Sequence, residues 1–108
     1  MVRTQEVSAQ VFYILLVLSV RSRHGYEIMK QVEIESNRKI KLGPGTLYGA
    51  VKRLLEEKVI KEVSAPKNAD ERRKYYTLTE KGQKILNAEI ERYEQALHAA
   101  KRKTLKLA

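Results

Sequence analysis

The 108-residue sequence contains no cysteine and no tryptophan, and it has only two prolines and two histidines. The absence of cysteine excludes a disulfide framework, a thiol nucleophile and any cysteine-ligated metal. His24 and His98 lie far apart, with no carboxylate at a recognisable ligand spacing, so the sequence predicts no metal site and no cofactor. Hydroxyls, carboxylates and histidines show no grouping of a nucleophile with a base, and we therefore expect no catalytic residue and no enzymatic activity.

A long hydrophobic segment is also missing. The longest apolar run, VFYILLVL at residues 11–18, falls far short of the roughly 20 residues that span a bilayer. The sequence SVRSRHG follows this run, where a signal peptide would have a small-residue cleavage site. We therefore expect a buried helix in a cytoplasmic protein, with no membrane as partner.

Acidic residues are the minority among the charged ones. Lysine and arginine total 22 against 13 aspartate and glutamate, which gives a net charge of +9. This excess favours a polyanionic partner such as nucleic acid, although lysines can also simply keep a small protein soluble. With 43% hydrophobic and 32% charged residues, the composition is that of a globular chain, long enough for one domain with a modest core.

The apolar pattern predicts a mainly α fold with a small β-hairpin. Apolar residues recur at helical spacing in four segments, and two short segments are rich in β-branched and aromatic residues. The expected helices cover residues 7–20, 26–36, about 44–58 and 80–105, and the expected strands cover residues 59–63 and 74–78. The order is therefore helix, helix, turn, helix, two-stranded wing and long helix.

The third helix has two glycines in its first turns, Gly45 and Gly49. An interior glycine destabilises a helix by about 1 kcal/mol relative to alanine. With Leu47 and Val51 turned inward, both glycines share the outward line of the helix with Lys52. Bare backbone on that line lets a surface approach within van der Waals contact, and the flanking side chains can then reach phosphates or base edges.

Basic residues surround this outward line, with five of them and no acidic residue between Arg38 and Leu55. A helix that follows another through a short turn and precedes a basic hairpin is typical of proteins that insert a helix into the DNA major groove. For Tyr48 a second interpretation is that it props the third helix on the second. The predicted contacts with double-stranded DNA are Lys41, Gly45, Thr46, Tyr48, Gly49, Lys52, Arg53, Arg72, Arg73 and Lys74.

The last helix carries a heptad seam, because apolar residues recur at alternating spacings of four and three. At about 1.5 Å per residue, a helix over residues 80–105 is about 40 Å long, which exceeds the width of so small a domain. Packing on the first helix accounts for one or two turns, so we expect the far half to pair with a second copy. The predicted dimer interface is Val11, Leu15, Leu86, Ile90, Tyr93 and Leu97.

Three motifs resemble those of the PadR family of bacterial transcriptional regulators, specifically its short subgroup with a single C-terminal helix. They are HGYEI at residues 24–28, GTLYGAVKRLLEEKVI at residues 45–60 and RRKYYTLTEKG at residues 72–82. The resemblance implies a winged helix-turn-helix domain over residues 1–78 and a dimerisation helix over residues 79–108. It also implies a homodimeric repressor, with recognition contacts at Thr46, Tyr48 and Lys52 and wing contacts at 72–74. Such a dimer is expected to read a pseudo-palindromic operator.

The sequence departs from the family pattern at two points. The family commonly has glycine where Lys58 stands, so we expect a differently shaped exit from the third helix. Some short members bind flat drugs between paired tryptophans, for which Tyr93 is the nearest substitute here. A candidate pocket for a small hydrophobic or phenolic effector comprises Phe12, Leu15, Tyr93 and Leu97, with a plain dimer core as the equal alternative. The alternative function is a winged-helix protein-interaction module without direct DNA readout.

Overall fold

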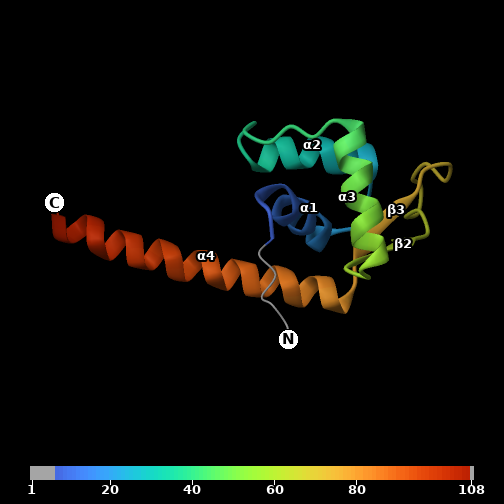
Figure 1. Ribbon diagram of the computed structural model, residues 1–108. Helices are drawn as coiled ribbons and strands as arrows, with labels where there is room; N and C mark the ends of the chain where they lie inside the picture. Colours follow the sequence, from blue (N-terminus) through green and yellow to red (C-terminus); the bar gives the residue numbers. More distant parts are fainter. Residues whose placement is uncertain (1–6, 108) are drawn as a thin grey trace.

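The computed structural model describes residues 7–107 of the chain, with side chains described up to Thr104. Three helices and a small sheet form one body, and the last helix runs far beyond it (Figure 1). The molecule is accordingly elongated, with extents of 55 × 35 × 26 Å. The elements are α1 (Ala9–Val20), β1 (Arg23–His24), α2 (Gly25–Glu35), α3 (Pro44–Glu56), β2 (Ile60–Val63), β3 (Tyr75–Leu78) and α4 (Glu80–Leu107).

The sheet has one strand more than the sequence predicts. β1 pairs antiparallel with β3, and the resulting order is β1-β3-β2. The pattern did not indicate β1 because two residues, Arg23 and His24, carry no alternation of polar and apolar side chains. They become a strand only because Tyr76 and Tyr75 of β3 lie opposite them.

The helix boundaries follow from local capping. Ser8 begins α1, since its hydroxyl accepts the N–H of Val11 at 3.1 Å. Thr79 caps α4 as its position predicts, accepting the N–H of Gly82 at 3.0 Å. The same Thr79 hydroxyl donates to the carbonyl of Lys58 at 2.6 Å, which joins the start of α4 to the end of α3.

The exit from α3 has the shape that a glycine would give it, so the expected difference at Lys58 is not found. Lys58 is left-handed, with φ at 61°. Its N–H donates to the carbonyl of Leu55 at 3.0 Å, and the N–H of Val59 donates to the carbonyl of Leu54 at 2.9 Å. This pair of bonds ends a helix tightly and requires the left-handed residue between them.

The core lies around α1, which packs against α2, α4 and β3. Its apolar pattern covers most of the helix circumference, and four of its side chains are buried, in agreement with the sequence. Burying one such side chain stabilises the fold by about 1.5–3 kcal/mol. The largest fully buried side chains are Ile14, Leu15, Leu18, Ile28, Leu47, Ile60, Leu86, Val17 and Val32.

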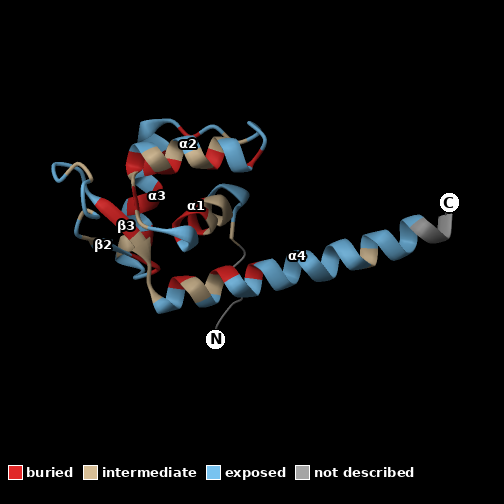
Figure 2. Ribbon diagram, turned by 180° about the vertical axis from the view of Figure 1, so that it is seen from behind, coloured by how far each residue is buried: buried red, intermediate tan, exposed pale blue. Residues whose placement is uncertain are grey.

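The two halves of α4 differ in their surroundings. The first half packs on α1 as far as the buried Glu89, whose carboxylate contacts Arg92 at 2.9 Å. From Ile90 to Thr104 every residue is exposed except the half-buried Ala99, as Figure 2 shows. The far half is therefore largely open to solvent over this range, although Tyr93 near its start still packs on Phe12 of α1. None of the helices described is both long and apolar enough to cross a membrane.

Candidate nucleic-acid interface

The outward edge of α3 is smooth and basic. Gly45, Thr46, Gly49 and Lys52 are exposed, while Leu47 and its neighbours on the opposite face are buried. A Cβ built on Gly45 or Gly49 would have no atom within 4 Å. Packing inside the protein therefore gives no reason for these glycines, and the bare edge they create faces solvent.

The turn between α2 and α3 is ordered by its own hydrogen bonds. Asn37 and Arg38 are both left-handed, with φ at 55° and 65°. The N–H of Arg38 donates to the carbonyl of Glu33 at 2.7 Å, and the hydroxyl of buried Ser36 accepts the N–H of Ile40 at 3.0 Å. These contacts fix the direction in which α3 starts, and they leave Lys41 exposed beside its first turn.

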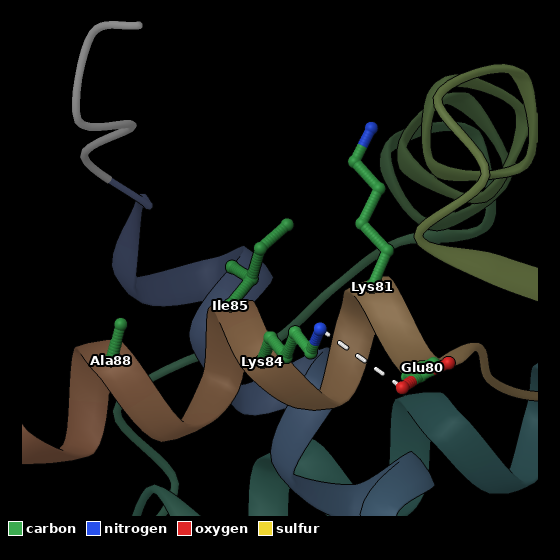
Figure 3. Close-up of a pocket in the computed structure, with 5 residues that line it drawn as sticks. All are labelled: Glu80, Lys81, Lys84, Ile85 and Ala88. Atoms are coloured by element: carbon green, nitrogen blue, oxygen red, sulfur yellow. Dashed lines mark ion pairs between the residues drawn. The ribbon is translucent and has the colours of Figure 1, made fainter.

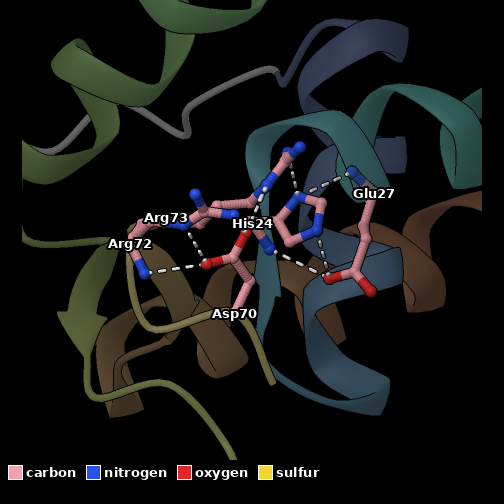
Figure 4. A network of polar contacts seen from close by, with 5 residues as sticks. All are labelled: His24, Glu27, Asp70, Arg72 and Arg73. Atoms are coloured by element: carbon pink, nitrogen blue, oxygen red, sulfur yellow. Dashed lines mark hydrogen bonds and ion pairs between the residues drawn. The ribbon is translucent and has the colours of Figure 1, made fainter.

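The wing is the β2–β3 hairpin together with its tip at residues 64–74. Arg72, Arg73 and Lys74 are exposed directly before β3. Asp70 accepts two bonds from the guanidinium of Arg72, at 3.1 and 3.3 Å, and lies 3.6 Å from Nε of Arg73 (Figure 4). Hydrogen bonding to Arg72 lowers the pKa of Asp70 to about 2. Two of the three cations thus have an internal acidic partner.

A second contact ties the wing to the start of α2. Nδ1 of His24 accepts the N–H of Glu27 at 3.2 Å, and the Glu27 carboxylate accepts the N–H of His24 at 3.1 Å. These reciprocal bonds cap α2. Nη1 of Arg73 lies 3.3 Å from the same Nδ1, so the wing reaches a residue 49 positions earlier in the chain (Figure 4). This role of His24 was not predicted from the sequence, although HGYE has capping-box spacing.

Tyr48 packs on α2, as expected if it holds α3 against that helix, and its side chain is also accessible. A Cβ on Gly25 would collide with the ring and hydroxyl of Tyr48, so the ring lies directly on the first residue of α2. The side chain nevertheless remains 48% exposed. Tyr48 therefore sits at the junction of α2 and α3 with part of its surface open to a partner.

The predicted dimer interface requires a correction. Leu15 is 0% exposed and Leu86 is 1% exposed within a single chain, because both belong to the core around α1. Neither side chain can offer surface to a second subunit or to an effector between subunits. Ile90, Tyr93 and Leu97 are exposed on α4, and Val11 is half-buried on α1.

The residues of the candidate effector pocket are brought together only in part. Phe12 and Tyr93 pack edge to face with ring centroids 4.9 Å apart, which joins α1 to α4. Leu97 lies one turn further along α4, outside this pair, and Leu15 is enclosed in the core.

Two of the hollows near α4 adjoin its first half, and neither was predicted from the sequence. One, of about 700 Å³, lies between α1, the end of α3 and the start of α4, where Val11, Leu54, Val59 and Ile85 meet Lys81. The other follows the first turns of α4, where Lys84 and Glu80 are 4.0 Å apart (Figure 3). All its lining residues come from one helix, so it is a strip of helix surface. Over the described residues, no three potential metal ligands are grouped to hold an ion.

Known transcriptional regulators resemble this chain in sequence and in fold. A model of the Transcriptional regulator PadR-like family matches residues 14–88, from α1 to the first half of α4. A solved PadR family transcription regulator from Clostridium difficile is 26% identical, covers 90% of this chain and 99% of its own, and has a TM-score of 0.73. A transcriptional regulator from Clostridium thermocellum is 26% identical over 87% of both chains, with a TM-score of 0.68. An uncharacterized Lysinibacillus sphaericus protein is 27% identical over 88% of both chains.

Proposed function

Because the chain belongs to the PadR-like family of transcriptional regulators, which are not enzymes, we propose that it acts as a homodimeric repressor bound to a pseudo-palindromic operator. We further propose that a small hydrophobic or phenolic effector releases it from DNA. A regulator of this kind works on the chromosome, so we expect it in the cytoplasm. The observation that carries the proposal is the outward edge of α3, which is bare, basic and unused by the protein itself.

The edge of α3 suits the major groove in shape and charge. The groove of B-DNA is about 12 Å wide and admits one helix whose forward face approaches the base edges. Gly45 and Gly49 remove the side chains from that face, and Thr46, Lys52 and Arg53 flank it. No ion pair involves Lys52 or Arg53 among the described residues, so both charges are available to phosphates.

The far half of α4 supports the homodimer. Ile90, Tyr93 and Leu97 form an exposed apolar seam on a helix that extends beyond its own domain. Such a seam is normally covered by a second helix at heptad spacing. Two copies joined in this way would carry two α3 helices, and an operator with half-sites about 34 Å apart would accommodate both.

The effector is proposed from the family resemblance, and the position of Phe12 and Tyr93 supports it. Their edge-to-face pair lies where α1 and α4 meet, beside the exposed seam. A flat aromatic compound bound there would change the packing between subunits. A thermal-shift screen with flat aromatic compounds measures this directly, and a ligand-dependent rise in melting temperature is the expected result.

The test of DNA binding begins with selection of a binding sequence from random duplexes by the purified full chain. If a dimer neutralises about six phosphates, log affinity should fall by about five per tenfold rise in salt. Lys52→Ala should lower operator affinity by about tenfold, as expected for loss of one contact of roughly 1–3 kcal/mol. Lys84→Ala, an equal change of charge on α4, should leave the affinity unchanged.

Three results would contradict the proposal. The chain could remain monomeric at micromolar concentration, it could ignore every duplex at low salt, or it could bind with no salt dependence. Capture of a protein partner that no DNA competes away would instead favour the protein-interaction module.

A further inference from the structure

A small cleft opens where α2, α3 and the wing meet, with a volume of about 170 Å³. A water molecule occupies about 30 Å³ in the liquid, so the cleft can hold a few waters or one compact polar group. Three separate segments contribute to its wall. Its lining residues are His24, Gly25, Tyr48, Arg73, Lys74 and Tyr76.

Tyr76 is the residue in this cleft that the fold alone does not explain. Its side chain is 5% exposed and its ring belongs to the hydrophobic core. Its hydroxyl has no hydrogen-bond partner among the described residues, and it is not itself enclosed, because no buried side-chain oxygen lacks a partner there. A hydroxyl that reaches solvent at the edge of a buried ring is free to bond to water or to a partner from outside. Because Tyr76 lines the cleft, the cleft is where a partner from outside can reach it.

The hydroxyl of Tyr76 is able to act as a donor. Burial raises the pKa of Tyr76 above its ordinary value, and Glu62, which lies opposite it on β2, raises the pKa further, as does Tyr48. The phenol therefore keeps its proton to a higher pH than usual, so its hydroxyl can donate a hydrogen bond to an acceptor.

Tyr48 brings a second hydroxyl to the same place. Its ring lies on Gly25, where any side chain would collide with it, so the absence of a Cβ at Gly25 leaves the room that the ring occupies. No hydrogen bond of the Tyr48 hydroxyl to another described residue is found. Two hydroxyl donors from α3 and β3 thus converge on one cleft.

The charges around the cleft favour an anion. Arg73 and Lys74 line it, and Gly25 is the first residue of α2, where the helix dipole is positive and the first N–H groups have no partner inside the helix. Among the nearby acidic groups, Glu62 on β2 is exposed and has no ion pair in the described part of the chain, so it opposes an anion, whereas Asp70 and Glu27 are engaged. Asp70 contacts Arg72 and Arg73, and Glu27 accepts the N–H of His24.

We propose that this cleft binds one phosphate of the DNA backbone, with the hydroxyls of Tyr76 and Tyr48 donating to its non-bridging oxygens. The proposal rests on the proposed function, because the operator supplies the phosphate. It makes Tyr48 a residue that positions the backbone, and it adds Tyr76, which the sequence placed only in the core. A phosphate held between α2, α3 and the wing would fix how deeply α3 enters the groove, without reading any base.

Tyr76→Phe tests the site, since this change removes only the hydroxyl and keeps the buried ring. We expect affinity to fall about five- to tenfold, equally for the selected operator and for an unrelated duplex, because a phosphate is common to both. The matched control is Tyr75→Phe. Tyr75 is 3% exposed on the other face of β3, where its ring meets that of His24 at 5.3 Å, and it does not line the cleft. The Tyr75→Phe variant should bind both duplexes with the affinity of the wild type.

A methylphosphonate scan of the operator identifies the phosphate itself. Neutralising one particular phosphate per half-site should weaken the wild-type complex, and the same substitution should cost the Tyr76→Phe complex much less. Three results would overturn the phosphate site while leaving the proposed regulator intact. They are an unchanged affinity of Tyr76→Phe, equal losses of affinity in Tyr76→Phe and Tyr75→Phe, and equal sensitivity of the wild-type complex to neutralisation of every phosphate. Failure of the wild-type chain to bind any duplex would instead overturn the proposed function, and this site with it.

Discussion

The edge of α3 and the wing are both basic, but their charges are held in different ways. Lys52 and Arg53 on α3 have no ion pair among the described residues. On the wing, Asp70 pairs with Arg72 and contacts Arg73, which also reaches His24. The edge of α3 can therefore meet phosphates without giving up an internal contact. To reach a phosphate, Arg72 and Arg73 would have to share or give up their contacts with Asp70 and His24.

This difference separates two demands on a DNA-binding surface. In the proposed complex the edge of α3 has to fit closely into the groove, so the missing side chains at Gly45 and Gly49 are its important property. In the same complex the wing has to hold its arginines near the duplex, so the network that orders them is its important property. If this comparison is right, a methyl group added to the outward edge of α3 should weaken operator binding. Removal of the negative charge at Asp70 should strengthen the contact of the wing with DNA.

Gly49→Ala should give the largest effect and tests the close fit. The added methyl meets nothing inside the protein, so the free energy of unfolding should rise by about 1 kcal/mol from helix propensity alone. Operator affinity should nevertheless fall by about tenfold, because the methyl occupies the space where α3 touches the groove. Calorimetry and fluorescence anisotropy measure the two quantities separately.

The control for Gly49→Ala is Asn87→Ala, at an exposed position of α4 away from α3. It changes helix propensity without touching the proposed interface, so operator affinity should stay constant. A Gly49→Ala variant that bound the operator as tightly as the wild type would show that the bare edge is not in contact with DNA.

Asp70→Asn should give a smaller effect of opposite sign, a gain of about threefold in affinity. The change frees the guanidinium of Arg72 for phosphate, and charge-assisted pairs of this kind are among the stronger polar contacts. Glu71→Gln is the matched control, because it removes the same charge at the next, exposed residue, which has no ion pair in the described part of the chain. Equal gains from both variants would mean that only net charge matters. A loss from Asp70→Asn would mean that Asp70 positions Arg72 for DNA.

The titration of Asp70 should give the smallest effect. Its pKa of about 2 lies below the ordinary 3.8, so its pairing with Arg72 is complete above pH 4 and is lost as the pH falls through about 2. The contribution to folding therefore disappears only in strong acid, and it is small because the pair is exposed. Carboxyl NMR should show the low midpoint, and Arg72→Gln should return it toward 3.8. A titration midpoint near 3.8 in the wild type would show that Asp70 is not paired with Arg72 in solution.

The parts of this fold that the sequence predicted are those that local rules govern. The periodicity of Ile14, Leu18 and Leu47 is a property of the helix itself, and Thr79 caps α4 through residues three positions away. The outward line of Gly45 and Gly49 follows from the same geometry. These features need no knowledge of what lies elsewhere in the chain.

The parts that the sequence missed depend on contacts between distant segments. Leu86 fits the heptad seam as well as Ile90 does, and only the packing of α1 over the first half of α4 shows that Leu86 is core. β1 exists because β3 lies beside it. The contact of Arg73 with His24 likewise joins residues 49 positions apart.

By itself, the sequence determined the helices, the bare basic edge of α3, the length of α4 and the absence of any grouping for catalysis, because these follow from spacing along one chain. Only the tertiary structure decided which seam residues are buried, how Asp70 and His24 hold the wing, and that Tyr48 and Tyr76 share one cleft with Gly25. The physical reason is that a spacing rule fixes the direction of a side chain from its own helix or strand. What that side chain meets there is fixed by the other elements that fold against it.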